Sequence, residues 1–138
     1  MAKNTDREIV QLLDREFANL IDSLKDLAAS ASPNPHVLRS AAVIEQMCGG
    51  LTVNLWDDPF EWTLPETLSN ADRVVDYLSE VNLARERAFD AIDDAALTKY
   101  IAMPSGEPKL LISLLLETLV RASELYGRSQ NALLSSPT

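Results

Sequence analysis

The chain has 138 residues, of which 46% are hydrophobic and 24% are charged. These proportions are close to those of average globular proteins, and the length suits one domain over residues 1–138. The net charge of −9 argues against a nucleic-acid partner, because phosphate neutralisation needs clustered Lys and Arg. It argues equally against an anionic membrane surface.

Cys48 is the only cysteine, which excludes an intrachain disulfide and a zinc site built on a cysteine pair. Its neighbours Met47 and Leu51 predict a buried thiol that behaves as a small apolar group. The N-terminal sequence MAKNTDREIV has no apolar signal core and no transit pattern, and no apolar stretch is long enough to cross a bilayer. We therefore expect a cytoplasmic protein without membrane contact.

The first predicted helix lies between Asp6 and Ala31. Its apolar residues recur at the helical period, namely Ile9, Leu13, Phe17, Leu20, Leu24 and Leu27. The segment 30–34 is rich in Ser, Pro and Asn, which predicts a loop.

The second predicted helix begins with Asn34 as cap and Pro35 at the first helical position, where its missing N–H is not needed. One face then carries Val37, Ala41, Ile44, Met47, Cys48 and Leu51. Gly49 and Gly50 weaken its last turns, and the helix is expected to reach about Leu55.

The third predicted helix starts after a cap at Ser69 or Asn70 and breaks at Asp93 and Asp94. Its stripe is Val74, Leu78, Val81, Arg85, Ala88 and Ile92. The fourth starts near Pro108, with a stripe of Leu111, Leu115, Ala122, Leu125, Ser129 and Leu133 that is widened by Leu114, Leu116, Leu119 and Val120. This last helix is expected to be the most buried, and no segment alternates long enough to predict a sheet.

These elements predict an all-α four-helix bundle. The first two helices are joined by a few residues and should pack antiparallel. The linker from about Asn54 to Ser69 is long enough to cross the whole bundle, which permits a parallel second and third helix.

That linker reads LWDDPFEWTLPET and holds both tryptophans, Trp56 and Trp62. One interpretation is a lid or pocket wall whose acids Asp57, Asp58 and Glu61 face a cation or act as general acids. The other is a set of aromatic anchors that fasten a long loop to the bundle. We favour anchoring, because no basic residue or histidine lies nearby in sequence to tune those acids.

The second half of the chain carries a family resemblance. Residues 83–104 (LARERAFDAIDDAALTKYIAMP) and 117–134 (ETLVRASELYGRSQNALL) are similar to the DinB-like superfamily, whose last helix usually carries the pattern HxxxHxGQ. The resemblance implies a four-helix bundle with a long crossover between helices 2 and 3, often as a homodimer. It also implies a divalent metal held by three histidines, and in some members a thiol-dependent transferase or isomerase activity.

The metal ligands do not carry over to this chain. If Gln130 matches the glutamine of the pattern, Ser123 and Gly127 occupy the two histidine positions, and neither replaces an imidazole. The family histidine on the second helix falls within Ala41 to Glu45. His36, Glu45, Glu117 and Glu124 are the remaining candidate ligands, but the lone histidine is typical of a helix start or a surface. We therefore expect no metal site and no cofactor.

The leading hypothesis is a DinB-like bundle that has lost its metal site and binds a small molecule or a protein, as a homodimer. A pocket between the second and fourth helices is expected to be lined by Glu45, Ser123 and Tyr126, with Trp56 and Trp62 beside it. The alternatives are a thiol-dependent transferase with a replacement site built from His36, Glu45 or the acids near Trp56, and a structural or regulatory module. No catalytic residue is identified.

Overall fold

A computed structural model describes residues 6–30, 35–54, 56 and 71–135. These residues form four α-helices, α2 (Glu8–Ser30), α3 (Pro35–Val53), α6 (Ala71–Asp90) and α7 (Leu111–Ser135). A short 3-10 helix, η1 (Asp94–Thr98), and two strands, β1 (Tyr100–Ile101) and β2 (Lys109–Leu110), separate α6 from α7. The predicted all-α class is confirmed, and no helix among the described residues is long and apolar enough to cross a bilayer.

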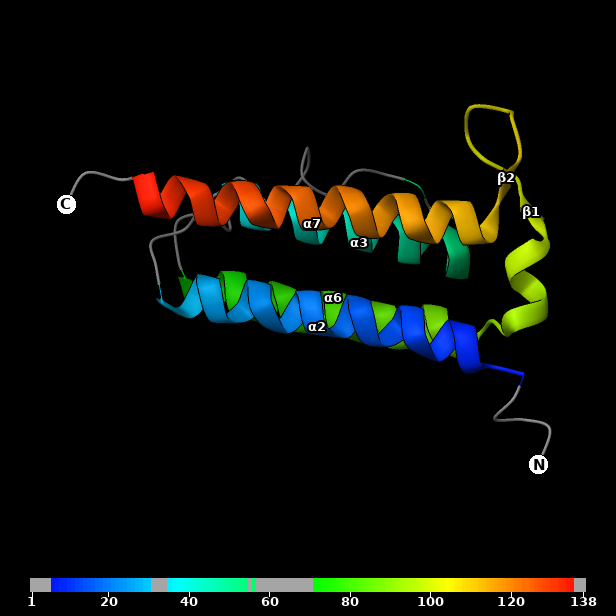
Figure 1. Ribbon diagram of the computed structural model, residues 1–138, viewed down its shortest axis with the longest axis horizontal. Coiled ribbons are helices and arrows are strands. Elements are labelled where there is room, and N and C mark those ends of the chain that lie inside the picture. The colour runs from blue at the N-terminus through cyan, green and yellow to red at the C-terminus, as the bar shows by residue number, and fades with distance from the viewer. Residues whose placement is uncertain (1–5, 31–34, 55, 57–70, 136–138) are drawn as a thin grey trace.

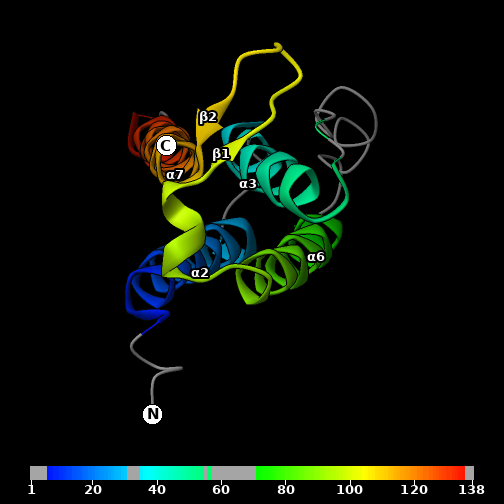
Figure 2. The same cartoon turned by 90° about the vertical axis from the view of Figure 1, so that its right-hand side faces the viewer.

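The four helices pack as a bundle in which α3 and α7 form one layer and α2 and α6 the other (Figures 1 and 2). The order of the colours in Figure 1 shows that α3 and α6 run in the same direction, while α2 and α7 run in the opposite one. A parallel second and third helix is the arrangement that the long linker permits. The connecting residues 57–70, with Trp62 among them, lie outside the described residues.

The bundle core follows the apolar stripes of the sequence. Phe17 of α2 and Phe89 of α6 pack together in this core, with ring centroids 5.5 Å apart at an angle of 46°. The structure differs from the sequence prediction at two places in the core. Ile9 is 47% exposed, because Val10 takes the core position, and Leu116 and Val120 are 45% and 57% exposed rather than widening the buried face of α7.

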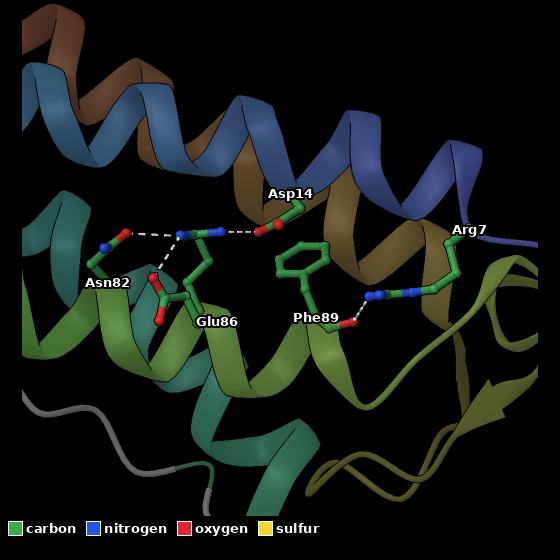
Figure 3. Close-up of polar contacts among 6 residues, drawn as sticks. Arg7, Asp14, Asn82, Glu86 and Phe89 are labelled. Carbon is green, nitrogen blue, oxygen red and sulfur yellow. Dashed lines mark hydrogen bonds and ion pairs between the residues drawn. The ribbon is translucent and has the colours of Figure 1, made fainter. Parts of the chain in front are cut away.

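Two charged side chains join the start of α2 to the end of α6. Arg7 donates to the carbonyl oxygen of Phe89 in the last turn of α6 at 2.6 Å (Figure 3). It also donates to the carbonyl oxygen of Ile92, just after the helix, at 3.3 Å. In return, the Asp94 carboxylate accepts from the backbone N–H groups of Ile9 (3.1 Å) and Val10 (2.9 Å) in the first turn of α2. Each helix end therefore receives a capping charge of the sign that its dipole favours.

The last helix begins at Leu111 and not near Pro108. Lys109 and Leu110 instead pair with Ile101 and Tyr100 in a two-residue antiparallel ladder, and the intervening turn contains Gly106 at a φ of 91°. The Leu111 N–H bonds the Lys99 carbonyl oxygen at 2.9 Å. The two residues after Pro108 therefore belong to a strand and not to the helix. A strand of two residues is too short to show as apolar alternation in the sequence.

Candidate functional site

A hollow of about 640 Å³ lies between α3 and α7. Beneath it, the Ser40 hydroxyl on α3 donates to the Ala122 carbonyl oxygen on α7 at 2.7 Å, and both residues are fully buried. This bond ties the two helices at one point. The hollow is lined by Pro35, His36, Arg39, Ala42, Val43, Gln46, Arg121, Glu124, Leu125 and Arg128.

The charge of this hollow is opposite to that of the chain. Three arginines, Arg39, Arg121 and Arg128, line it against one carboxylate, Glu124, although the chain as a whole carries −9. In the described part of the chain, the guanidinium groups of Arg121 and Arg128 make neither a hydrogen bond nor an ion pair. Their donors are therefore available to an anion.

A second hollow of about 410 Å³ continues the first toward the hairpin end of the bundle. The two share Val43, Gln46 and Arg121, so we treat them as one groove, the α3–α7 groove. The lining of the second hollow is more apolar and includes Met47, Trp56, Met103, Pro104 and Leu114, together with Lys109, Glu117 and Thr118. The groove thus has a basic end and an apolar end.

Trp56 is held in the groove wall by contacts with α3. Its carbonyl oxygen accepts from the Gln46 side chain at 2.8 Å, and its indole N–H donates to the Asn54 side chain at 3.0 Å. A Cβ on Gly50 would lie 2.3 Å from the indole ring, so the ring packs directly on the glycine backbone. Asn54, the residue after α3, has a φ of 57°, a conformation that Asn tolerates better than most residues. This packing supports the anchoring interpretation for Trp56.

The charged pair at the apolar end is already matched. Lys109 Nζ lies 3.1 Å from the Glu117 carboxylate, and both side chains are more than one-third exposed. An exposed pair of this kind adds little stability. It does cancel the charge of Lys109, which leaves that end of the groove close to neutral.

A separate polar cluster surrounds the buried Arg85 side chain between α2 and α6. The Arg85 guanidinium on α6 pairs with Asp14 on α2, donates to Asn82 at 3.0 Å and lies 3.6 Å from Glu86 (Figure 3). The Arg85 side chain is 9% exposed, so these partners are what makes its charge tolerable in the core.

Cys48 and Glu45 of α3 belong to the same region. Burial raises the pKa of Cys48 to about 12, with Arg85 opposing the rise and Glu45 and Asp14 adding to it. A thiol with that pKa is protonated at neutral pH and is a poor nucleophile. The cysteine is therefore an apolar core residue, as its neighbours in the sequence predict.

The structure separates the side chains that were expected to line one pocket. Trp56 lines the groove, but Glu45 lies toward α6, where the Tyr77 hydroxyl donates to its carboxylate. Ser123 is exposed and Tyr126 accepts from Gln130 at 2.9 Å, and neither lines the groove. Ser123 is about 200° around the helix from Arg121, so the two face different sides of α7. Trp62 lies outside the described residues.

The residues present do not fit the metal of the DinB-like family. Ser123 and Gly127 offer no imidazole, and among the described residues no group of three or more His, Cys, Asp and Glu is placed to hold a metal ion. His36 lines the basic end of the groove beside arginines, which repel a cation.

Sequence reasoning missed the arginines of the groove. Arg121 and Arg128 are seven residues apart, two turns of one helix face, and this spacing was the available signal. It does not reveal that Arg39 of α3 lines the same hollow.

Comparison of this chain with protein-family models, with curated proteins and with solved structures finds no match.

Proposed function

We propose that this domain binds a small organic anion in the α3–α7 groove, without a metal ion. The single observation that carries the proposal is the convergence of Arg39, Arg121 and Arg128 on one hollow of about 640 Å³ in an otherwise acidic chain. The volume is typical of small-molecule sites. A guanidinium binds a carboxylate or phosphate through two parallel hydrogen bonds, which gives orientation as well as affinity.

The acidic surroundings favour selectivity. Glu124 lies between Arg121 and Arg128 on α7 and lines the same hollow. A single carboxylate among three arginines leaves the site positive and limits the negative charge that a ligand must bring. The −9 charge of the whole chain repels polyanions such as nucleic acids, so a small anion that fits between α3 and α7 is preferred.

Calorimetric titration with acetate and with inorganic phosphate tests this proposal. The double variant Arg121→Ala/Arg128→Ala should lose about tenfold or more in affinity for both anions, since a charge-assisted hydrogen bond is worth about 1.5–3 kcal/mol. The matched control Arg15→Ala/Arg73→Ala removes the same charge from exposed positions of α2 and α6. Equal losses in both double variants would reduce the effect to overall charge and contradict the proposal.

A second part of the proposal concerns assembly. We infer that the chain forms a homodimer through the outer face of α7, in line with the DinB-like resemblance. Support comes from Leu116 and Val120, which lie one turn apart on α7 and are 45% and 57% exposed. Sedimentation at high protein concentration should find a dimer that Leu116→Glu weakens. A strictly monomeric species would contradict this part alone.

We also propose that the chain is related to the DinB-like superfamily and that the protein is located in the cytoplasm.

The alternative activity, a thiol-dependent transferase, differs in what it requires of the groove. It needs a small thiol bound beside a second substrate, and Cys48 cannot take the role of that thiol because it is buried in the core. Thiol-transferase activity in protein purified without chelator would favour the alternative over a simple binding domain.

A further inference from the structure

We propose that the ligand is an amphipathic anion, with a carboxylate or phosphate head at the basic end of the α3–α7 groove and an apolar tail at the end that Trp56 walls. This inference rests on the proposed function and adds the chemical class of the ligand. It follows from the polarity of the groove along its length, which anion binding alone does not require.

The basic end is built to hold a head group. Arg39 of α3 and Arg121 of α7 line it next to the Ser40–Ala122 hydrogen bond, and its lining also includes the buried apolar residues Ala42 and Leu125. A head group at this point therefore meets guanidinium donors at the rim and an apolar floor below. Such a floor cannot hydrate the anion, which strengthens each hydrogen bond from an arginine.

Beyond Arg121, which the two hollows share, the charged residues that line the apolar end are paired with each other. The indole N–H of Trp56 is bonded to Asn54, and the Lys109 ammonium lies 3.1 Å from Glu117. Met47 and Met103, a helix residue and a loop residue, add flexible thioether side chains. Methionine side chains adapt to apolar ligands of varied shape and the Trp56 ring adds a large apolar surface, so this end suits an alkyl or aryl tail.

The two ends are the right distance apart for one molecule. Arg121 belongs to both hollows, and Leu114 lies seven residues before it on α7. Seven residues correspond to about 10 Å of helix rise, a span that a medium-length acyl chain covers. A head at the arginines thus places its tail beside Trp56 without leaving the groove.

The test compares probes that differ in head or tail. Acetate, octanoate, inorganic phosphate, octyl phosphate and octanol are each titrated by calorimetry at one ionic strength. Octanoate and octyl phosphate should bind at least about tenfold more tightly than acetate and inorganic phosphate, because each buried methylene adds affinity. Octanol should bind more weakly than octanoate. The two eight-carbon anions also show which head group the arginines prefer.

Variants at each end make the outcome specific. Trp56→Ala should lower the affinity for octanoate at least about fivefold and leave that for acetate unchanged. Met103→Ala, a change in the loop outside the helices, gives the same readout if Trp56→Ala fails to fold. Val53→Ala, an exposed position at the end of α3, is the matched control.

The experiment distinguishes a failure of this inference from a failure of the proposed function. Equal binding of acetate and octanoate, both sensitive to Arg121→Ala/Arg128→Ala, would overturn this inference and leave the proposed function standing. No binding of any anion would overturn both. Octanol binding as tightly as octanoate would also overturn the inference, because the head group would then contribute nothing.

Discussion

Glu45 couples the folding of this domain to pH. Tyr77 donates a hydrogen bond to its carboxylate on the α3–α6 side of the bundle. Burial raises the pKa of Glu45 above its usual 4.5, the hydrogen bond from Tyr77 lowers it in part, and the nearby charge of Glu80 raises it further. A carboxyl group whose pKa is higher in the folded state binds more protons when folded. Its contribution to stability is present below pH 4.5 and is lost as the pH rises through the folded-state pKa.

Replacing Glu45 by Gln should remove this pH dependence. Gln keeps an acceptor for Tyr77 but cannot ionise, so Glu45→Gln should gain stability relative to the natural protein as the pH rises from below 4.5 to neutral. Urea unfolding at a series of pH values measures the difference. Glu16→Gln, at an exposed position of α2, controls for the loss of one charge. A difference that stays constant with pH would contradict the assignment.

The sequence pattern was a good predictor of which side chains are buried. It was a poor predictor of the partners that those side chains contact. Arg85 completes the apolar stripe of its helix in the sequence, and it is buried as that position indicates. Its partner Asp14 is 71 residues away on another helix, and no local pattern joins the two. Glu45 was expected in a pocket with Ser123, but the rotation of α3 about its axis places it beside Tyr77 instead.

At the scale of elements, the end of α3 depends on a close approach of backbone and ring. Gly50→Ala would place a methyl group 2.3 Å from the Trp56 indole, so the ring must move away from the groove wall. We expect a loss of about 1–3 kcal/mol in the free energy of unfolding. A Trp62→Phe background leaves Trp56 as the only tryptophan, and its fluorescence should shift to longer wavelength as the indole meets water.

Gly127 supplies the matched control on α7. A Cβ at this helical glycine has no atom within 4 Å to meet. Gly127→Ala should therefore raise the stability by roughly 0.5–1 kcal/mol, the cost of a glycine inside a helix. If Gly50→Ala were as stabilising as Gly127→Ala, the packing of Trp56 on α3 would be wrong.

Element boundaries were predictable where a residue has a local effect on the backbone. Pro35 begins α3 as its missing N–H indicates, and α6 ends at Asp90, just before the two acids that were expected to stop it. The start of α7 was misplaced by three residues, because Pro108 precedes a strand and not the helix. Pairing with Tyr100 and Ile101 decides that boundary, and strand pairing of two residues leaves no period to detect.

At the scale of the molecule, the groove exists only once α3 and α7 are packed. The family resemblance indicated that a pocket, if the fold has one, would lie between these two helices, but not which faces would form it. Composition concealed the basic end, since a chain with a net charge of −9 gives no sign of a local positive site. The apolar periodicity fixed the core sides of α3 and α7, and the polar residues at the margins of those sides, Arg39 and Arg121 among them, line the groove.

The anion site is tested most directly by a titration of the protein with octanoate, followed through the chemical shifts of assigned backbone amides. Binding in the α3–α7 groove should change the shifts along α3 and α7 near Arg39, Gln46, Arg121 and Leu125, and also at Trp56. The chemical shifts of amides on the faces of α2 and α6 that point away from the groove should not change. Changes concentrated on α2 and α6, or spread evenly over the bundle, would contradict an anion site between α3 and α7.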